Sequence, residues 1–274
     1  EQFDTILALL KRKKNIILQG PPGVGKTFVA RRIAYAMMGE KNKSRAPMIQ
    51  FHQSYAYEDF IQGYRPAPDG KGGFVLKNGV FHDLCKEALE DGDREYFLII
   101  DEINRGNLSK IFGELMMLIE HDKRGEEYAL QLTYSSDDFH VPPNLHIIGT
   151  MNTADRSLSM VDYALRRRFS FIALNPEFES PNFETLLQTA NASTDMVQTI
   201  IARLTALNGT IAEDTHNLGK GYRIGHSFFC PDQGSTANED WYRGVVNFEI
   251  APLLREYWMD DERKADAEIE NLQL

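Results

Sequence analysis

The chain has 274 residues, of which 42% are hydrophobic and 26% charged, and its formal net charge is −10. A chain of this size can bury a large core without disulfides or structural metals. The negative balance argues against general nucleic-acid binding, which rests on many Lys and Arg contacts to phosphate. With two separated cysteines, no signal peptide and no apolar run long enough to cross a bilayer, we expect a cytoplasmic protein with no membrane partner.

The first two-thirds of the chain alternate strand and helix patterns. Strands separated by helices in this way imply a mostly parallel sheet covered on both faces. In chain order we expect a strand at 15–19, a helix at 26–38, a strand at 48–52, a loop or hairpin at 63–78, a helix at 80–90, a strand at 96–101, a helix at 108–121, a hairpin at 128–141, a strand at 145–150, a helix at 159–166 and a strand at 169–174.

The last third of the chain is helical. Its predicted helices lie at 183–190, 195–213 and 241–258, and the charged tail after Asp260 forms a surface helix or frays. Prolines near 175–181 mark a domain boundary. We therefore expect an α/β core over residues 1–177 and a small helical lid over residues 178–274.

A glycine-rich turn between the first strand and the first helix carries the strongest motif, G-x-x-x-x-G-K-[ST]. Glycines let such a loop turn its N–H groups inward, and together with the helix N-terminus these donors bind phosphate. The lysine reaches the outer phosphates, and the threonine hydroxyl can ligate Mg²⁺. The candidate nucleotide ligands are Gly20, Pro21, Pro22, Gly23, Val24, Gly25, Lys26, Thr27 and Phe28.

A second motif ends the apolar strand at 96–101 with two carboxylates. Asp101 would reach the sheet edge and hold Mg²⁺ with Thr27, while Glu102 would polarise the attacking water. A solvated Asp-Glu turn is the plain alternative, and the phosphate-binding loop makes it the weaker one.

Two further features point to the same chemistry. Asn152 ends the strand at 145–150, where it would orient water or sense the γ-phosphate, unless it only caps the next turn. Three arginines at 166–168 either complement a helix C-terminus or supply an arginine finger to the neighbouring subunit, with Arg167 or Arg168 favoured.

These four features in this order resemble an AAA+ ATPase core. The resemblance implies an α/β domain with strand order 5-1-4-3-2, a helical lid and a ring hexamer with nucleotide at each subunit interface. The Asp-Glu-Ile-Asn-Arg run from Asp101 to Arg105 and the insert 120–141 are similar to the MoxR and dynein-related branch.

A narrower resemblance is carried by Met-Asn-Thr-Ala-Asp-Arg-Ser at 151–157, which is similar to the signature of the McrB family. That family is the nucleotide-driven subunit of the McrBC modification-dependent restriction system. Segments at 51–55, 57–66, 120–126 and 219–227 also look McrB-like, so the resemblance runs from about Ile16 to about Tyr257.

The resemblance implies a GTP-preferring, Mg²⁺-dependent hydrolase that forms a hexamer and binds a McrC-like nuclease subunit, in a complex that translocates on DNA. It also implies that Asp155 and Arg156 organise the subunit interface and the catalytic water, and that Arg223 contacts phosphate as a second sensor. GTP preference rests on the family alone, because the chain lacks a guanine-reading N-K-x-D motif.

One departure concerns DNA recognition. McrB proteins carry an N-terminal DNA-binding domain, whereas here the first predicted strand already begins at Asn15. Either the chain is a piece of a longer protein or the natural protein lacks that module. The rival functions are an ATP-dependent MoxR-like remodelling chaperone and a silent scaffold that uses nucleotide only to hold a ring.

Overall fold

The computed structural model describes residues 2–68, 72–155 and 163–274. The chain divides into two compact units, each with its own hydrophobic core. The first unit comprises residues 1–19, 26–151 and 156–173, and the second comprises residues 20–25, 152–155 and 174–274.

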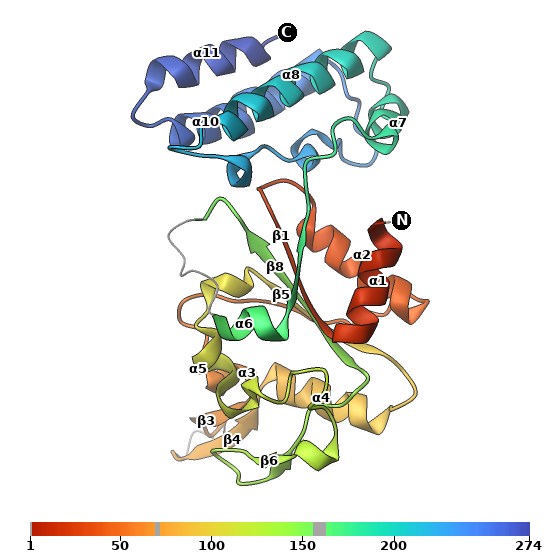
Figure 1. Ribbon diagram of the computed structural model, residues 1–274, viewed down its shortest axis with the longest axis vertical. Helices are drawn as coiled ribbons and strands as arrows, with labels where there is room; N and C mark the ends of the chain where they lie inside the picture. The colour runs from red at the N-terminus through yellow and green to blue at the C-terminus, as the bar shows by residue number, and fades with distance from the viewer. Residues whose placement is uncertain (1, 69–71, 156–162) are drawn as a thin grey trace. The chain divides into compact units, whose positions relative to one another are not determined.

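A five-stranded sheet with the order β2-β5-β8-β1-β9 forms the centre of the first unit (Figure 1). Counting only these strands in chain order gives 2-3-4-1-5, which is the predicted order 5-1-4-3-2 read from the other edge. The α/β fold with this order is therefore confirmed. The strand bounds are β1 Asn15–Gly20, β2 Met48–Gln50, β5 Tyr96–Asp101, β8 Leu145–Asn152 and β9 Ser170–Ala173.

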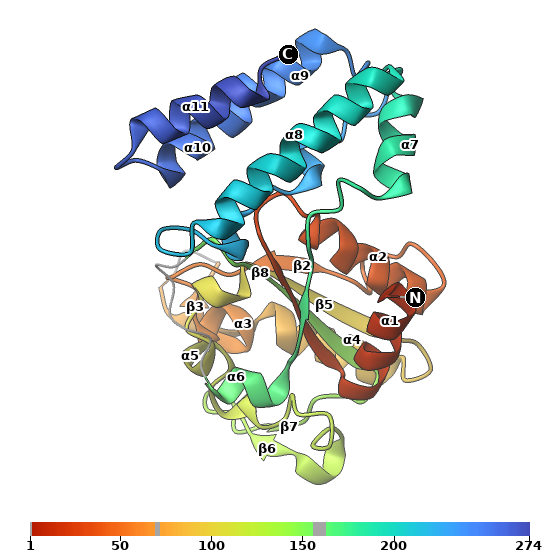
Figure 2. The same cartoon turned by 45° about the horizontal axis from the view of Figure 1, so that its top comes forward.

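Helices and two small hairpins complete the first unit. α1 lies beside α2 (Figure 2). In the sequence, each hairpin lies between two strands of the central sheet, as predicted, and each forms a two-stranded sheet of its own. Their bounds are α1 Gln2–Lys13, α2 Lys26–Met38, α3 Tyr57–Phe60, α4 Val80–Glu90, α5 Leu108–Phe112 and α6 Tyr163–Arg168 for the helices, and β3 Gln62–Pro66 with β4 Phe74–Asn78 and β6 Leu130–Gln131 with β7 Asp138–Phe139 for the hairpins.

The helix predicted at 108–121 is wrong in length. α5 ends at Phe112, because Gly113 adopts φ +51°, and a short 3₁₀ turn at Gly113–Met116 follows. The apolar residues of this stretch are still buried, since Ile111, Leu115 and Leu118 are each fully enclosed. Helical spacing therefore located the buried face, whereas the glycine decided where the helix stops.

Arg124 is a buried cation near the start of β1 in the first unit. Its guanidinium donates to the carbonyl oxygens of Ile119 (3.0 Å), Pro142 (3.3 Å) and Leu145, and to Asn15 Oδ1 (2.7 Å). Burial lowers the pKa of Arg124 to about 10. Backbone carbonyls, rather than a carboxylate, thus satisfy this charge and fix the insert to the start of β1.

The second unit is helical apart from its loop segments. Its long helix α8 Thr194–Glu213 packs against α7 Pro181–Thr189 and α11 Glu262–Leu272 (Figure 2). α9 Glu239–Val245 continues through a π turn at Val246–Ile250 into α10 Ala251–Tyr257. Pro252 lacks an N–H donor, and the π turn lies just before it, where the hydrogen-bond register must change.

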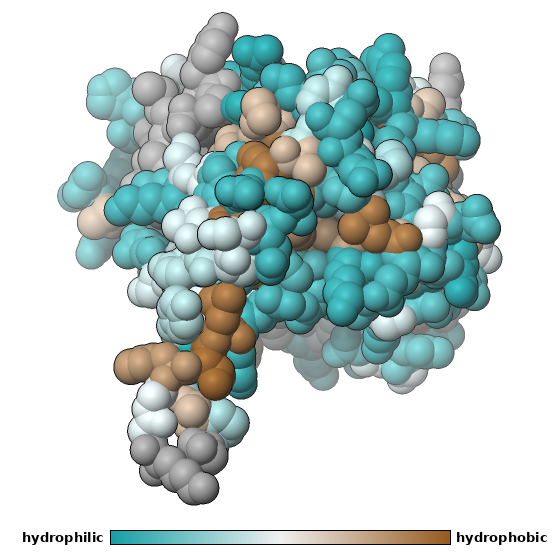
Figure 3. All heavy atoms as spheres, turned by 90° about the horizontal axis from the view of Figure 1, so that it is seen from below, coloured by the Kyte–Doolittle hydropathy of each residue, from teal (hydrophilic) through white to brown (hydrophobic). Residues whose placement is uncertain are grey.

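The face seen in Figure 3 is mostly hydrophilic, with a few hydrophobic areas. Phe60 and Phe81 are fully buried and stack, so the aromatics of this region divide between core and surface. Tyr64 and Phe74 of the β3–β4 hairpin stay exposed. No helix in the described ranges 2–68, 72–155 and 163–274 has the length and apolar character to cross a bilayer.

Candidate functional site

Three side chains meet at the carboxyl ends of the central strands in the first unit. Asp101 ends β5, and its Oδ1 accepts from Thr27 Oγ1 (3.1 Å) at the start of α2. Thr150 of β8 also donates its hydroxyl to Asp101 Oδ1. The structure thus brings together Thr27 and Asp101, the two predicted Mg²⁺ ligands.

Glu102 follows Asp101 in a strained conformation. It adopts φ 51° and ψ 46°, the left-handed region that costs a non-glycine residue about 1–3 kcal/mol. Its N–H donates to Thr150 Oγ1 (3.3 Å), and its carboxylate lies 3.4 Å from the Arg105 guanidinium. Backbone and side chain are both fixed, so the carboxylate has a defined position beside Asp101.

Lys26 begins α2 beside these acids. Burial lowers its pKa, while the nearby carboxylates of Glu102 and Asp101 oppose that shift. An ammonium group withdrawn from water is stabilised by an anion, and polyphosphate is the anion that a G-x-x-x-x-G-K-[ST] loop receives. The hydroxyl and carboxylate oxygens of Thr27 and Asp101 are hard ligands that suit Mg²⁺. The residues present therefore fit a Mg²⁺-nucleotide.

The loop residues 20–25 belong to the second unit, where the backbone of other segments holds them. Gly23 and Gly25 adopt φ +75° and +74°, a region that favours glycine. Gly225 N–H donates to Pro22 O (2.9 Å), and Ser227 N–H donates to Gly23 O (2.7 Å). Phe28, in the first unit, is 62% exposed, and the Arg32 guanidinium lies 4.9 Å from its ring centroid.

Asn152 and Asp155 lie in the second unit, and Arg156 lies outside the described residues. Asn152 ends β8, and its Oδ1 accepts the N–H of Ala154 (3.1 Å). The capping bond expected for the plain alternative is therefore present. This hydrogen bond uses the side-chain oxygen of Asn152 and does not involve its amide nitrogen.

The arginines that end α6 have different surroundings. Arg168 Nε donates to Met116 O (2.6 Å), and its Nη2 lies 3.0 Å from the buried Glu120 carboxylate. The Arg167 side chain is 73% exposed, and its Nη2 lies 4.0 Å from Glu120 Oε2. Arg166 lies over the ring of Phe171. Arg168 is thus held within its own unit, whereas Arg167 reaches solvent.

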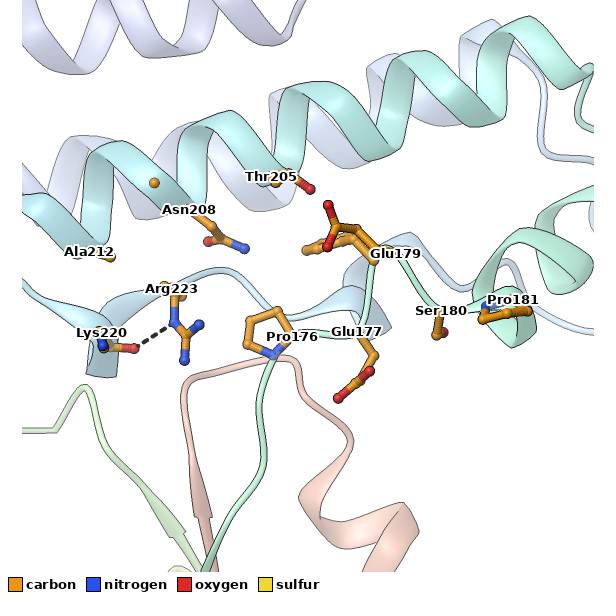
Figure 4. Close-up of a pocket in the computed structure, with 12 residues that line it drawn as sticks. Pro176, Glu177, Glu179, Ser180, Pro181, Thr205, Asn208, Ala212, Lys220 and Arg223 are labelled. Atoms are coloured by element: carbon orange, nitrogen blue, oxygen red, sulfur yellow. Dashed lines mark hydrogen bonds between the residues drawn. The ribbon is translucent and has the colours of Figure 1, made fainter. Parts of the chain in front are cut away.

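Arg223 lines a pocket of about 550 Å³ in the second unit (Figure 4). Its Nε donates to Lys220 O (3.1 Å), and its Nη2 donates to Asn175 Oδ1 (2.8 Å). Glu177 and Glu179 line the same pocket. Neutral oxygens hold the guanidinium, so its charge is not cancelled by a carboxylate in these contacts.

Sequence reasoning missed Thr150 and Gly225. The sequence marks Thr150 as the end of a predicted strand; the signal that could identify it is its position two residues before Asn152, on the same face of β8. Gly225 was noted only within a McrB-like segment. Its role depends on a backbone contact between residues far apart in the chain, for which a single sequence carries no signal.

Known proteins resemble this chain over most of its length. Residues 15–169 match the AAA domain (dynein-related subfamily), and residues 199–266 match the McrB alpha-helical lid domain. The chain is 55% identical over 267 residues to the "Type IV methyl-directed restriction enzyme EcoKMcrB subunit" of Escherichia coli strain K12, covering 96% of this chain and 58% of that protein. It is 28% identical over 222 residues to the "Type II restriction enzyme BsuMI component YdiS" of Bacillus subtilis strain 168, covering 64% of each.

The chain thus spans little more than half of the Escherichia coli relative. The first family match covers the sheet with Lys26, Thr27 and the Asp101–Glu102 pair, and the second falls within the helical second unit. The chain therefore belongs to the dynein-related subfamily of AAA domains and carries the alpha-helical lid domain of McrB.

Proposed function

We propose that the chain is the Mg²⁺-dependent, GTP-hydrolysing motor of a McrBC-type restriction complex that translocates on DNA. The observation that carries the hydrolytic part is the contact of Thr27, the last residue of the phosphate-loop sequence, with Asp101, which Glu102 follows. Restriction is proposed from the names of the two bacterial relatives. Preference for GTP over ATP is proposed from the McrB resemblance.

In this proposal the loop 20–25 and Lys26 bind the β- and γ-phosphates. Thr27 and Asp101 hold Mg²⁺, which supplies electrostatic stabilisation of the phosphates when bound. The oxygen of the attacking water bonds to the γ-phosphorus while the bond from that phosphorus to the β-phosphate oxygen breaks, so the nucleoside diphosphate leaves. Glu102 takes the proton that the water loses. Asn152 orients that water through its amide nitrogen. Phe28 is a further nucleotide-binding residue, and Arg223 contacts phosphate as a second sensor.

The assembly in this proposal is a homo-hexameric ring with nucleotide at the subunit interfaces. Arg167, rather than Arg168, is the finger that reaches the neighbour's nucleotide, because Arg168 is held by Met116 and Glu120. Asp155 and Arg156 organise the same interface. An isolated subunit is then a poor catalyst, since part of its charge stabilisation comes from the next one.

The partners proposed from the family are a McrC-like nuclease subunit and DNA, which the chain engages as part of the complex. We assign nucleotide binding to the core at 1–177 and the lid function to 178–274. The complex works in the cytoplasm.

Glu102→Gln gives the sharpest test of the chemistry. The amide keeps the shape of the side chain but is a much weaker base, so turnover should fall by about 10²–10⁴ while nucleotide affinity stays near that of the wild type. Turnover is measured as phosphate release with GTP and Mg²⁺. Unchanged turnover in this variant would remove Glu102 from the mechanism.

Competition between GTP and ATP, with and without a McrC-like partner, tests the identity of the motor. We expect GTP to be preferred and the partner to stimulate its hydrolysis. Preference for ATP with no response to the partner would favour a MoxR-like remodelling chaperone instead. Absence of phosphate release from the assembled oligomer would favour a scaffold.

A further inference from the structure

The phosphate loop is fixed from the side by a short segment that lies about 200 positions later in the sequence, residues 225–227. Both hydrogen bonds between them join backbone atoms within the second unit: Gly225 N–H to Pro22 O (2.9 Å) and Ser227 N–H to Gly23 O (2.7 Å). A third bond, from Thr153 N–H to Gly20 O (3.1 Å), anchors the start of the loop. Three loop carbonyls are therefore turned toward protein donors.

The direction of these carbonyls sets the direction of the neighbouring N–H groups. In a planar trans peptide the C=O and the following N–H point in opposite directions, and the described peptide bonds are all trans. With Pro22 O and Gly23 O facing residues 225–227, the N–H groups of Gly23 and Val24 face away from them. Among the described residues, neither N–H finds an acceptor.

The contact leaves no room for a side chain. A Cβ atom at Gly225 would overlap the Gly23 carbonyl group and the Val24 nitrogen, and a Cβ atom at Gly23 would overlap the Phe228 ring. Gly225 is itself buried, so an added methyl group would point into protein and not into solvent. Glycine at position 225 is thus required by the close approach of two backbones rather than by its own φ angle.

We infer that residues 225–227 are a positioning clamp that holds the loop peptides with their N–H groups turned toward a bound phosphate. The inference rests on the proposed function, because it assigns the loop to a nucleoside triphosphate. It adds that phosphate affinity depends on the part of the chain that follows the sheet, through backbone contacts that touch no nucleotide atom. Residues 225–227 position donors and do no chemistry themselves.

Gly225→Ala tests the clamp directly. The added methyl group must push the Gly23–Val24 peptide aside, and losing one charge-assisted hydrogen bond to phosphate weakens binding by about tenfold or more. The matched control is Gly209→Ala, in the helix α8, where an added Cβ meets nothing within 4 Å. The measurement is titration with a fluorescent GTP analogue and MgCl₂.

The unfolding temperature, measured without and with the analogue, separates positioning of the loop from general stability. We expect Gly225→Ala to keep the helical circular dichroism spectrum without nucleotide. We expect it to lose most of the rise in unfolding temperature that the analogue gives the wild type. A variant that binds as tightly as Gly209→Ala would overturn the clamp and leave the proposed function standing. A wild-type chain that binds no analogue would overturn both.

Ser227→Pro provides a second, independent test should Gly225→Ala fail to fold. Proline removes the N–H that bonds Gly23 O, and position 227 lies in the first turn of the 3₁₀ helix His226–Phe229, where the ring is tolerated. Its control is Glu239→Pro at the first position of α9, whose N–H is not used in the helix. The clamp predicts several-fold weaker binding for Ser227→Pro only, and equal affinity of the two variants would refute it.

Discussion

Replacing Thr150 with valine should weaken the centre of the first unit in a measurable way. The Thr150 hydroxyl donates to Asp101 Oδ1 and accepts the N–H of the strained Glu102 (3.3 Å), and Thr150 is 1% exposed. A hydrogen bond to a charged group contributes about 1.5–3 kcal/mol, and an unpaired buried N–H costs about 1–3 kcal/mol. Since water can partly replace these bonds at a half-buried edge, we expect Thr150→Val to lower the free energy of unfolding by about 2–4 kcal/mol.

The control for this variant is Thr150→Ser, which keeps the hydroxyl and loses only a methyl group, worth about 1 kcal/mol. Tryptophan fluorescence is the wrong probe, because both tryptophans, Trp241 and Trp258, lie in the second unit. Amide hydrogen exchange of β5 reports on the correct unit. Equal protection of β5 in the valine and serine variants would refute the bridging role of the hydroxyl.

Three further predictions concern other parts of the structure. Arg167→Ala should lower turnover of the assembled protein by about 10³ or more, whereas Arg168→Ala should mainly lower the free energy of unfolding. Mixing Arg167→Ala subunits with Glu102→Gln subunits should restore phosphate release. Failure of the mixture to release phosphate would contradict a finger that acts between subunits. Arg124→Met should lower the free energy of unfolding by about 3–5 kcal/mol, because buried carbonyls lose their donor, while Arg12→Met at the surface should change little in the same denaturation experiment. Hydrogen bonds from Lys264 and Trp258 lower the pKa of Asp214 to about 2, below its value of about 4 in the unfolded chain. The stabilising effect of the Asp214 carboxylate is therefore present above pH ~4 and is lost as the pH falls toward 2. Asp214→Asn should flatten this part of the profile of stability against pH, followed by Trp258 fluorescence, and an unchanged slope would contradict the assignment.

Much of the fold could be predicted because strongly periodic segments control it. The helices at Lys26–Met38 and Val80–Glu90 and the strand Tyr96–Asp101 have the predicted bounds, because their apolar periodicity is strong along the whole element. The helix α1 Gln2–Lys13 was missed. The stretch after Leu108 was predicted too long, because helical spacing of buried residues persists through a 3₁₀ turn.

The residues of the candidate site also differ in how far the sequence alone can predict them. Motif residues such as Lys26, Thr27 and Asp101 could be named from local sequence, because their chemistry requires fixed residue types at fixed spacing. Thr150 has only a weak local signal, its place two residues before Asn152 on the same strand, and Gly225 has none, because it acts through backbone contact with a distant segment. The proposal of Arg167 over Arg168 also draws on the structure, because the two side chains are identical and differ in their contacts with Met116 and Glu120.

The most direct test is an experimental structure of the assembled protein with a non-hydrolysable GTP analogue and Mg²⁺. The account predicts phosphates on the N–H groups of the loop 20–25 and on Lys26, with the metal beside Thr27 and Asp101. A nucleotide found elsewhere, for example in the pocket lined by Lys220 and Glu179, with the loop bare, would contradict it.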